Sequence, residues 1–185
     1  MNSSEQNLWI AQTKNGNNKA FEKLVIAFSP LVFTMIYRRL NHRENAEEVA
    51  QDVFLRAYKY IESYKGESKF STWLCTIANN TATTFLQKRK IDMVELSPES
   101  YERAGVNQHA TLEKEEQTVS IESAIASLGN EDAQLITLYY QAEQSIREIA
   151  AILNIEENNV KVKLYRARKK LHEQLVKNKT IQYEY

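Results

Sequence analysis

The sequence predicts an all-α protein of two small helical domains joined by a flexible acidic linker, the second domain containing a helix-turn-helix. Four Gly and two Pro among 185 residues are too few for the tight turns of a β-protein. Apolar residues recur three and four positions apart along most of the chain, the spacing of a buried helix face. With 43% hydrophobic and 26% charged residues, folded cores are expected. We place the domains at 1–92 and 117–185, with the linker at 93–116.

The first expected helical segment spans residues 7–40, where Leu24, Phe28, Leu31 and Met35 form an apolar stripe. The dipeptide Ser29-Pro30 interrupts this stripe. Because Ser caps helices and Pro suits a first helical turn, we expect a bend and a new helix there. A second helix is expected from about Glu44 to Ser63. Its inward positions are Ala46, Val49, Ala50, Val53, Ala57 and Ile61.

A short loop is expected at residues 64–71, which read YKGESKFS and contain Gly66 without any helical period. A helix then follows from Thr72 to about Lys90 and ends in the cations Lys88, Arg89 and Lys90. Beyond it, the segment from Asp92 to Glu116 carries seven acidic side chains against two basic ones, and few large apolar residues. That composition predicts a linker.

The C-terminal segment contains four stretches with helical apolar spacing, at 119–128, 132–141, 146–153 and 158–175. Ser145-Ile-Arg-Glu148 is a capping-box pattern, in which the Ser and Glu side chains each accept a hydrogen bond from the other residue's amide. Asn154 can adopt the left-handed conformation that ends a helix, and Ile155 can then enter the core. Two helices joined in this way predict a helix-turn-helix.

The last of these helices is strongly basic, with six Lys or Arg and no acid between Asn158 and His172. Val160, Leu164, Ala167 and Leu171 share one face, so the opposite face can enter a major groove. A solvated basic helix of a bundle is the alternative interpretation. The residues expected to face DNA are Asn158, Asn159, Lys161, Val162, Lys163, Tyr165, Arg166, Arg168 and Lys169, of which the first five lie nearest the bases.

Four stretches, in this order, resemble the extracytoplasmic-function (ECF) group of bacterial RNA polymerase sigma factors. They are NKAFEKLV (18–25), AEEVAQDVFLRAYKYIESYKG (46–66), KFSTWLCTIANN (69–80) and SIREIAAILNIEENNVKVKLYRARKKL (145–171). The resemblance implies that region 2, in the first domain, binds the polymerase clamp helices and the melted minus-10 element. Region 4, in the second domain, would bind the flap and the minus-35 element, and the acidic linker would thread polymerase channels.

The resemblance also assigns candidate residues to region 2. Glu48, Gln51 and Asp52 form an acidic outer face that suits a basic polymerase helix, although a merely solvated face has the same composition. Strand opening needs aromatic stacking surfaces and a pocket for an unpaired base. Phe70 and Trp73 belong to residue types that are more often core anchors than DNA contacts. The minus-10 candidates are Tyr64, Lys65, Ser68, Lys69, Phe70, Trp73, Asn79, Asn80, Lys88, Arg89 and Lys90.

Enzymatic activity is not expected, because the three His residues are scattered and the sequence holds no metal-spaced Cys/His cluster or phosphate-binding Gly loop. The single cysteine, Cys75, sits among apolar neighbours and is expected in the core. We expect no cofactor and no metal. With no signal-peptide pattern and no apolar run approaching about 20 residues, a cytoplasmic protein without membrane insertion is expected.

Two other functions remain open from sequence. A stand-alone helix-turn-helix regulator would bind duplex DNA and not polymerase, which would leave the first domain unexplained. A pure interaction protein would leave the cationic helix unexplained. The sequence also departs from the family's usual pattern at Thr76, Thr84 and Gln87, and at Asn158-Asn159, where Gly-Thr is usual. The promoter sequence therefore cannot be transferred from a relative. Besides core RNA polymerase and promoter DNA, an anti-sigma factor is a candidate partner.

Overall fold

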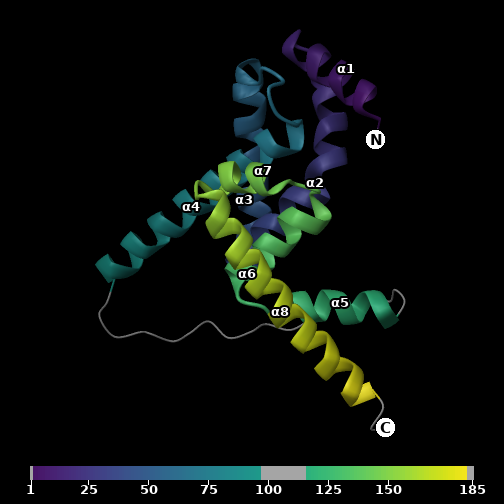
Figure 1. The fold of residues 1–185 in the computed structure, drawn as a ribbon. Helices are drawn as coiled ribbons and strands as arrows, with labels where there is room; N and C mark the ends of the chain where they lie inside the picture. Colours follow the sequence, from purple (N-terminus) through teal and green to yellow (C-terminus); the bar gives the residue numbers. More distant parts are fainter. Residues whose placement is uncertain (1, 97–115, 183–185) are drawn as a thin grey trace.

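The structure, a computed structural model, describes residues 2–96 and 116–182, and every regular element in these ranges is helical (Figure 1). This confirms the predicted all-α class. Residues 97–115, which are most of the expected linker, lie outside the described ranges. The N-terminal elements are α1 (Ser3–Lys14), α2 (Asn18–Leu40), α3 (Arg43–Tyr60), the 3-10 helix η1 (Ile61–Ser63) and α4 (Phe70–Leu96). The C-terminal elements are α5 (Glu116–Ala126), α6 (Asn130–Ile136), the π-helical turn η2 (Thr137–Gln141), α7 (Ile146–Leu153) and α8 (Glu157–Gln182).

The segment predicted as helical from residue 7 is divided by a break that the sequence analysis missed. Gly16 has a positive φ of 82°, a conformation that glycine adopts without steric cost. Asn17 then caps α2, because its side-chain oxygen accepts hydrogen bonds from the amides of Lys19 and Ala20 at 3.1 and 3.3 Å. The apolar spacing over residues 7–40 therefore belongs to two helices, α1 and α2, and the spacing alone does not show the break between them.

The expected bend and helix start at Ser29-Pro30 were wrong, because α2 passes through Pro30 without interruption. Proline removes one backbone hydrogen bond from a helix interior. Packing outweighs that loss here, since Phe28 and Val32 are both buried on either side of it. The Ser29 hydroxyl does not cap a new helix and instead donates to the Val25 carbonyl oxygen at 2.7 Å.

Helix α2 is also more apolar than the sequence analysis allowed. By length and composition alone it could cross a membrane, with a hydropathy of 1.5 over its most apolar window, whereas we expected no such stretch. Leu24, Phe28, Val32, Met35 and Ile36 of this helix lie in the hydrophobic core, so packing in the bundle accounts for part of its apolar character, and 33% of that window is buried. Core helices of soluble proteins pass the same test.

Helix α4 begins at Phe70 and continues to Leu96, which corrects the predicted end near Lys90. The residues just after Lys90 read IDMVEL, contain neither Gly nor Pro, and include the good helix formers Met, Glu and Leu. The residue before Pro98 is disfavoured in the helical conformation, so the sequence limits the helix only there. Residues 93–96 therefore extend α4.

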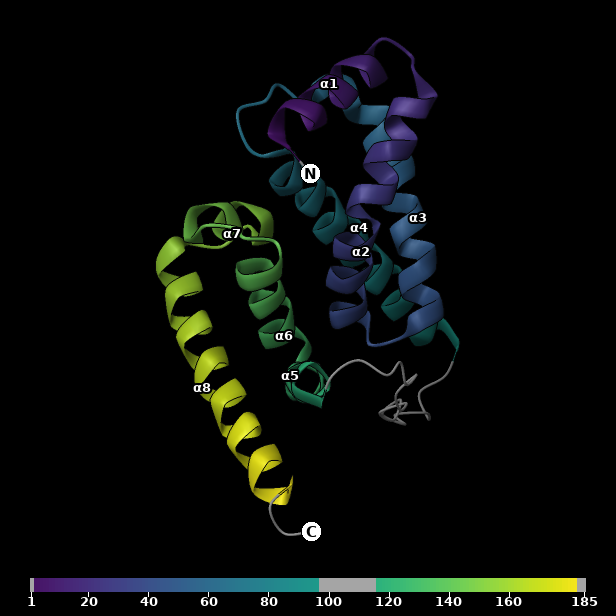
Figure 2. The ribbon, with the colours of Figure 1, turned by 90° about the vertical axis from the view of Figure 1, so that its right-hand side faces the viewer.

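The two domains pack against each other. One hydrophobic cluster contains the buried residues of α1–α4 together with Leu135, Leu138, Ile149 and Ile152 from the C-terminal domain. A second, smaller cluster, which includes Ile125, Leu128, Ile136, Leu164 and Ala167, joins α5, α6 and α8. In Figure 2, α6 and α7 lie between α8 and the N-terminal helices, in agreement with the contacts of α6 with α2 and of α7 with α4.

Candidate nucleic-acid interface

The helix-turn-helix forms as the sequence predicts. The Ser145 hydroxyl accepts from the Glu148 amide at 3.2 Å, and the Glu148 carboxylate accepts from the Ser145 amide at 2.7 Å, so the capping box is complete. Asn154 adopts the left-handed conformation with φ 53° and ends α7. Ile155 packs against the core, and the chain then enters α8.

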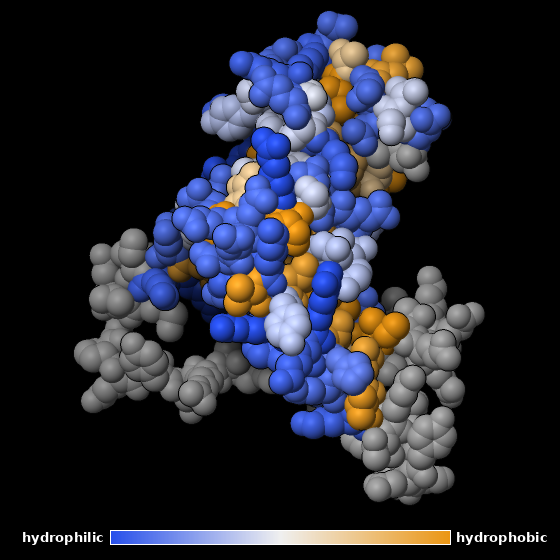
Figure 3. Space-filling view, in the orientation of Figure 1, coloured by the Kyte–Doolittle hydropathy of each residue, from blue (hydrophilic) through white to orange (hydrophobic). Residues whose placement is uncertain are grey.

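Helix α8 presents one buried and one exposed face. Val160, Leu164 and Ala167 are fully buried, as predicted, whereas Leu171 is only half-buried. Of the nine candidates on the opposite face, eight are exposed and Lys163 is half-buried. Figure 3, viewed from the side on which α8 lies in front, shows a largely hydrophilic surface with separate apolar areas. The geometry therefore presents the proposed reading face to solvent.

Three cations of α8 have partners within the C-terminal domain. Lys163 Nζ lies 2.8 Å from the Glu131 carboxylate of α6, and Lys170 Nζ lies 2.5 Å from Asp132. The hydrogen bond and charge of Lys163 hold the pKa of Glu131 below its usual value. The Arg168 guanidinium sits 4.6 Å from the centre of the Tyr139 ring, a cation–π distance. These contacts fix the direction of otherwise flexible side chains.

The loop before α4 is held in place by an aromatic cluster. Tyr64, Phe70 and Trp73 have ring centres 5.4–5.5 Å apart, and Phe28 meets Phe70 at 5.2 Å. The Tyr64 hydroxyl donates to the Ser68 carbonyl oxygen at 2.7 Å, across the loop. Tyr64 and Phe70 are buried, and burial raises the pKa of Tyr64. In this arrangement both are core side chains.

The other minus-10 candidates differ in exposure. Trp73 is half-buried and Asn79 is buried beneath the C-terminal domain, where its amide donates to the Ile152 carbonyl oxygen at 2.9 Å. Lys69 is exposed, but its ammonium donates to the Glu143 carbonyl oxygen at 3.1 Å. The remaining candidates are exposed: Lys65, Ser68, Asn80, Lys88, Arg89 and Lys90.

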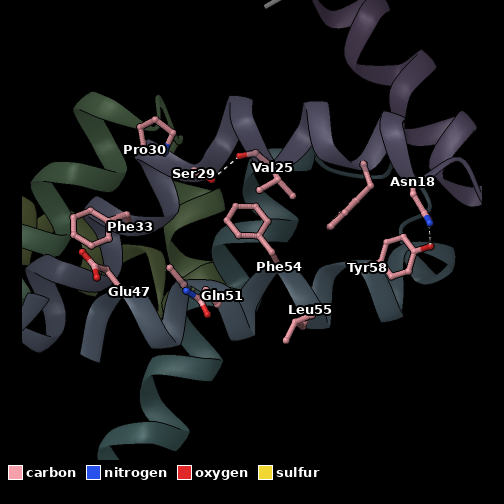
Figure 4. Close-up of a pocket in the computed structure, with 12 residues that line it drawn as sticks. Asn18, Val25, Ser29, Pro30, Phe33, Glu47, Gln51, Phe54, Leu55 and Tyr58 are labelled. Atoms are coloured by element: carbon pink, nitrogen blue, oxygen red, sulfur yellow. Dashed lines mark hydrogen bonds between the residues drawn. The ribbon is translucent and has the colours of Figure 1, made fainter. Parts of the chain in front are cut away.

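The polymerase-binding candidates Glu48, Gln51 and Asp52 are exposed on α3, as predicted. Gln51 lies at an open apolar groove of about 900 Å³ between α2 and α3, which Figure 4 shows from the side. This groove was not predicted from the sequence. Its signal was a second apolar stripe beside the buried one, at Ala50, Phe54 and Tyr58 on α3. The groove is lined by Asn18, Phe21, Val25, Ser29, Pro30, Phe33, Glu47, Ala50, Gln51, Phe54, Leu55 and Tyr58.

Side-chain contacts fix one end of the groove, and an exposed leucine forms part of its edge. Phe21 and Tyr58 pack with ring centres 4.9 Å apart, and the Tyr58 hydroxyl donates to the Asn18 side chain at 2.6 Å (Figure 4). Leu55 is 69% exposed at the edge. Such a trough between two helices has the shape and polarity that accept the apolar face of a partner helix.

Among the described residues, the cysteine and the candidate metal ligands do not form a site. Cys75 is fully buried in the core, where burial raises its pKa to about 12. Within residues 2–96 and 116–182, no group of three His, Cys, Asp or Glu side chains is arranged to hold a metal ion.

Comparison with known proteins assigns both halves of the chain. Residues 24–91 match the family described as Sigma-70 region 2, and residues 118–171 match Sigma-70, region 4. The chain is 33% identical over 177 residues to the ECF RNA polymerase sigma factor SigW of Bacillus subtilis, covering 90% of this chain and 94% of that one. It is 30% identical over 169 residues to the ECF RNA polymerase sigma-E factor of Escherichia coli K12, covering 86% and 88%.

Solved structures share the fold. The sigma factor RpoE of Bartonella quintana, in complex with the anti-sigma factor NepR, superposes with a TM-score of 0.69 at 22% identity, covering 85% of this chain and 97% of that one. CnrH, in complex with the cytosolic domain of CnrY, gives 0.62 at 22% identity, covering 92% and 97%. With both regions matched in order and relatives aligned over nearly their whole length, this chain belongs to the ECF group of RNA polymerase sigma factors.

Proposed function

We propose that this sigma factor holds core RNA polymerase with α3 and the α2–α3 groove, captures the melted minus-10 element around the loop before α4, and reads the minus-35 element with α8. It acts in the cytoplasm and catalyses no reaction itself. The functional division is residues 1–92, a linker at 93–116, and residues 117–185. The observation that carries the proposal is that one chain combines a solvent-facing cationic recognition helix with an apolar groove suited to a protein helix.

The groove supports the polymerase contact. Its floor is apolar, whereas its α3 rim carries Glu47 and Gln51, and Glu48 and Asp52 are exposed on the same helix. An amphipathic helix with an apolar face and basic flanks would satisfy both parts, and the charges would steer its approach. The clamp helices of core polymerase, which the family's region 2 binds, are the proposed occupant.

The start of α8 supports minus-35 reading. Asn158, Asn159 and Lys161 are exposed in its first turns, where a recognition helix meets base edges. Amide side chains pair bidentately with adenine and lysines with guanine. Arg166, Arg168 and Lys169 lie further along the helix, where contacts to phosphates are more frequent. The same helix can therefore both position the protein and read sequence.

The loop before α4 supports the minus-10 role through its exposed polar groups. Lys65, Ser68 and Lys69 are exposed just before α4, Trp73 is half-buried in its first turn, and Asn80 is exposed further along the same helix. Cations can pair with the phosphates of a single strand, and an indole face can stack on an unpaired base. Because Tyr64 and Phe70 are buried, we propose that they shape the loop and that the exposed residues contact DNA.

An anti-sigma factor is a further proposed partner. The solved relatives were captured with the anti-sigma factor NepR and with the cytosolic domain of CnrY. A protein that inserted a helix into the α2–α3 groove would exclude polymerase from the same surface, which is a direct way to hold a sigma factor inactive.

Run-off transcription with purified core polymerase over a genomic promoter pool tests the proposal. The wild-type protein should direct specific starts, and Leu55→Glu should abolish both start selection and co-elution with polymerase. Leu55 is 69% exposed, so the charge should not disturb the core. Leu8→Glu, at a 55% exposed position on α1 away from the groove, is the matched control and should behave as wild type. Sequence-specific DNA binding without polymerase binding would instead support the stand-alone regulator.

A further inference from the structure

We propose that Lys14, the last residue of α1, is a positioning residue for promoter opening, because it fixes the loop before α4 (residues 64–69) in the conformation that captures an unpaired strand. Lys14 acts through the loop and does not itself contact DNA. The role of the loop rests on the proposed function, whereas the contacts of Lys14 do not. Helix α1 ends before the region 2 match begins at residue 24, so the roles assigned to that region do not include it.

Lys14 contacts the first residue of the loop. Its Nζ donates a hydrogen bond to the Tyr64 carbonyl oxygen at 2.5 Å, although the two residues are 50 positions apart in the sequence. The same ammonium lies 6.0 Å from the centre of the Tyr64 ring, a cation–π distance. Lys14 is half-buried. A charge-assisted hydrogen bond that is partly shielded from water is stronger than a neutral one, so this contact can hold the start of the loop.

The carbonyl that Lys14 contacts follows the end of a helix. Helix α3 continues into η1, which ends at Ser63, and the Tyr64 amide donates to the Ile61 carbonyl oxygen at 3.1 Å. Carbonyl groups at the C-terminal end of a helix have no partner further along it and carry partial negative charge, so a cation is favoured there. Lys14 supplies this cation from a different helix.

A second hydrogen bond closes the loop on the same tyrosine. The Tyr64 hydroxyl donates to the Ser68 carbonyl oxygen at 2.7 Å, and its ring packs against Phe70 and Trp73. Between these ends, Gly66 has a φ of 78°, which lets the chain reverse without steric cost. Tyr64 therefore joins the two ends of the loop, and Lys14 holds Tyr64.

Helix α1 is anchored in the first domain, so Lys14 is a fixed point for the loop. Ile10 belongs to the main hydrophobic cluster, and Thr13, beside Lys14, is buried. Helix α1 packs on α2 and on η1, and Figures 1 and 2 show it at the same end of the domain as the loop. At Gly16 the chain turns toward α2. The position of Lys14 is therefore set by contacts outside the loop.

A loop that is already ordered favours capture of a single strand. Lys65, Ser68 and Lys69 are exposed, and their side chains converge on one strand only while the backbone that carries them keeps one shape. Ordering a mobile loop during capture would cost conformational entropy, and a loop fixed beforehand avoids that cost. Lys14 lies neither on α8 nor among the lining residues of the α2–α3 groove. Its loss should therefore impair opening while polymerase binding and closed-complex binding persist.

Two measurements on the full-length protein test the proposal. Hydrogen–deuterium exchange of the free protein reports the order of residues 64–69. Permanganate reactivity over time reports promoter opening by the reconstituted polymerase complex, on the promoter that run-off transcription selects.

The variants separate the charge of Lys14 from its bulk. Lys14→Met removes the charge and the donor but keeps an unbranched apolar side chain, whereas Lys14→Arg keeps both. Lys14→Gln, which is shorter and uncharged, is the second variant should Lys14→Met fail to fold. Tyr64→Phe removes the hydrogen bond to Ser68 and keeps the ring. Lys23→Met is the matched control, because Lys23 Nζ lies 5.5 Å from the Trp9 ring of α1 and, within the part of the chain that the structure describes, no hydrogen bond joins it to the loop.

We expect Lys14→Met to speed exchange in residues 64–69 and to slow opening by about ten-fold. Lys14→Arg should recover most of the opening rate, and Lys23→Met should match wild type in both measurements. Tyr64→Phe should also slow opening, and its combination with Lys14→Met should slow it by less than the product of the two effects, since both hold the same loop. Affinity of the polymerase complex for a single-stranded minus-10 oligonucleotide should fall by the same factor as the opening rate.

Wild-type exchange of residues 64–69 in Lys14→Met would overturn the claim that Lys14 orders the loop. Faster exchange with a wild-type opening rate would overturn its role in strand capture. An equal loss in Lys23→Met, or a loss of polymerase binding in Lys14→Met, would reveal a general effect on the fold and would also overturn the proposal. If the wild-type complex opened no promoter, the proposed function would fail, while exchange in the free protein would still decide whether Lys14 orders the loop.

Discussion

Lys163 of the recognition helix donates a hydrogen bond to Glu131 of α6 at 2.8 Å. The pair ties a proposed base-reading side chain to the supporting helix, whereas Lys161, two residues earlier, is exposed. The sequence predicts the same base-reading role for both lysines. In the free protein, however, Lys163 is paired with Glu131, whereas the Lys161 side chain is exposed to solvent.

Lys161→Ala should change the preferred minus-35 sequence, because a good bidentate contact to a base contributes about 1–3 kcal/mol of discrimination. Selection from randomised minus-35 libraries measures the change. Arg168→Ala should instead weaken all promoters alike and lower the salt slope by about one unit. An unchanged preference for Lys161→Ala would contradict the placement of this helix in the groove.

Glu131→Gln should strengthen minus-35 binding by removing a negative charge near DNA and freeing Lys163. The pKa of Glu131 is held low, so the carboxylate stays charged near neutral pH and loses its charge only in acid. Fluorescence anisotropy at two salt concentrations would measure the gain, which should be largest at low salt. Asp132→Gln, which disrupts the Lys170 pair, is the control, because Lys170 is not a proposed DNA contact.

The double substitution Ser68→Ala and Lys69→Ala should impair promoter opening while leaving closed-complex binding largely intact. Stacking of a base on an aromatic side chain contributes about 1–3 kcal/mol, so loss of the polar groups proposed to hold the strand beside Trp73 should shift a near-balanced melting step. Tyr64, Phe70 and Trp73 are retained, so the aromatic cluster should still fold. Permanganate reactivity and transcription on a duplex promoter are compared with a pre-opened bubble. Wild-type behaviour on the duplex would exclude this loop from melting.

Stability should fall in acid partly through Glu148. Burial raises the pKa of Glu148. Hydrogen bonds from the Ser145 amide and hydroxyl and from Thr72, together with the charge of Lys69, lower it. The lowering effects are larger in sum, so the pKa lies below its usual value. A lowered folded-state pKa gives stability that is present above the unfolded value near 4.5 and is lost as pH falls through the folded value. Glu148→Gln should therefore lower Tm at pH 7, and the difference should shrink as the pH falls below 4.5. A difference independent of pH would contradict this.

Asn154→Ala should destabilise the protein by about 1 kcal/mol, because Ala lacks the short polar side chain that allows Asn to tolerate the left-handed conformation. Asn154→Gly should be neutral or slightly stabilising at the same position. Urea denaturation of the pair provides the comparison, and equal effects of Ala and Gly would show that the turn relaxes to another conformation.

The fold was largely predictable wherever local chemistry decides it. The capping box at Ser145 and the left-handed Asn154 depend on neighbouring residues alone, and both formed as predicted. The uninterrupted α2 was not predictable, because packing of Phe28 and Val32 against distant helices overrides the local preference of Pro30. The burial of Asn79 likewise depends on the docking of the second domain, which no local pattern encodes.

The hydrophobic cluster that runs from α1–α4 into α6 and α7 has a consequence for how the protein melts. Two domains joined only by a tether would unfold in two separate calorimetric steps. Here unfolding of the first domain would expose apolar side chains of the second, namely Leu135, Leu138, Ile149 and Ile152. Both domains should therefore unfold together on heating. A destabilising change in either half would then lower a single shared transition, and the calorimetric and van't Hoff enthalpies would agree for the whole chain.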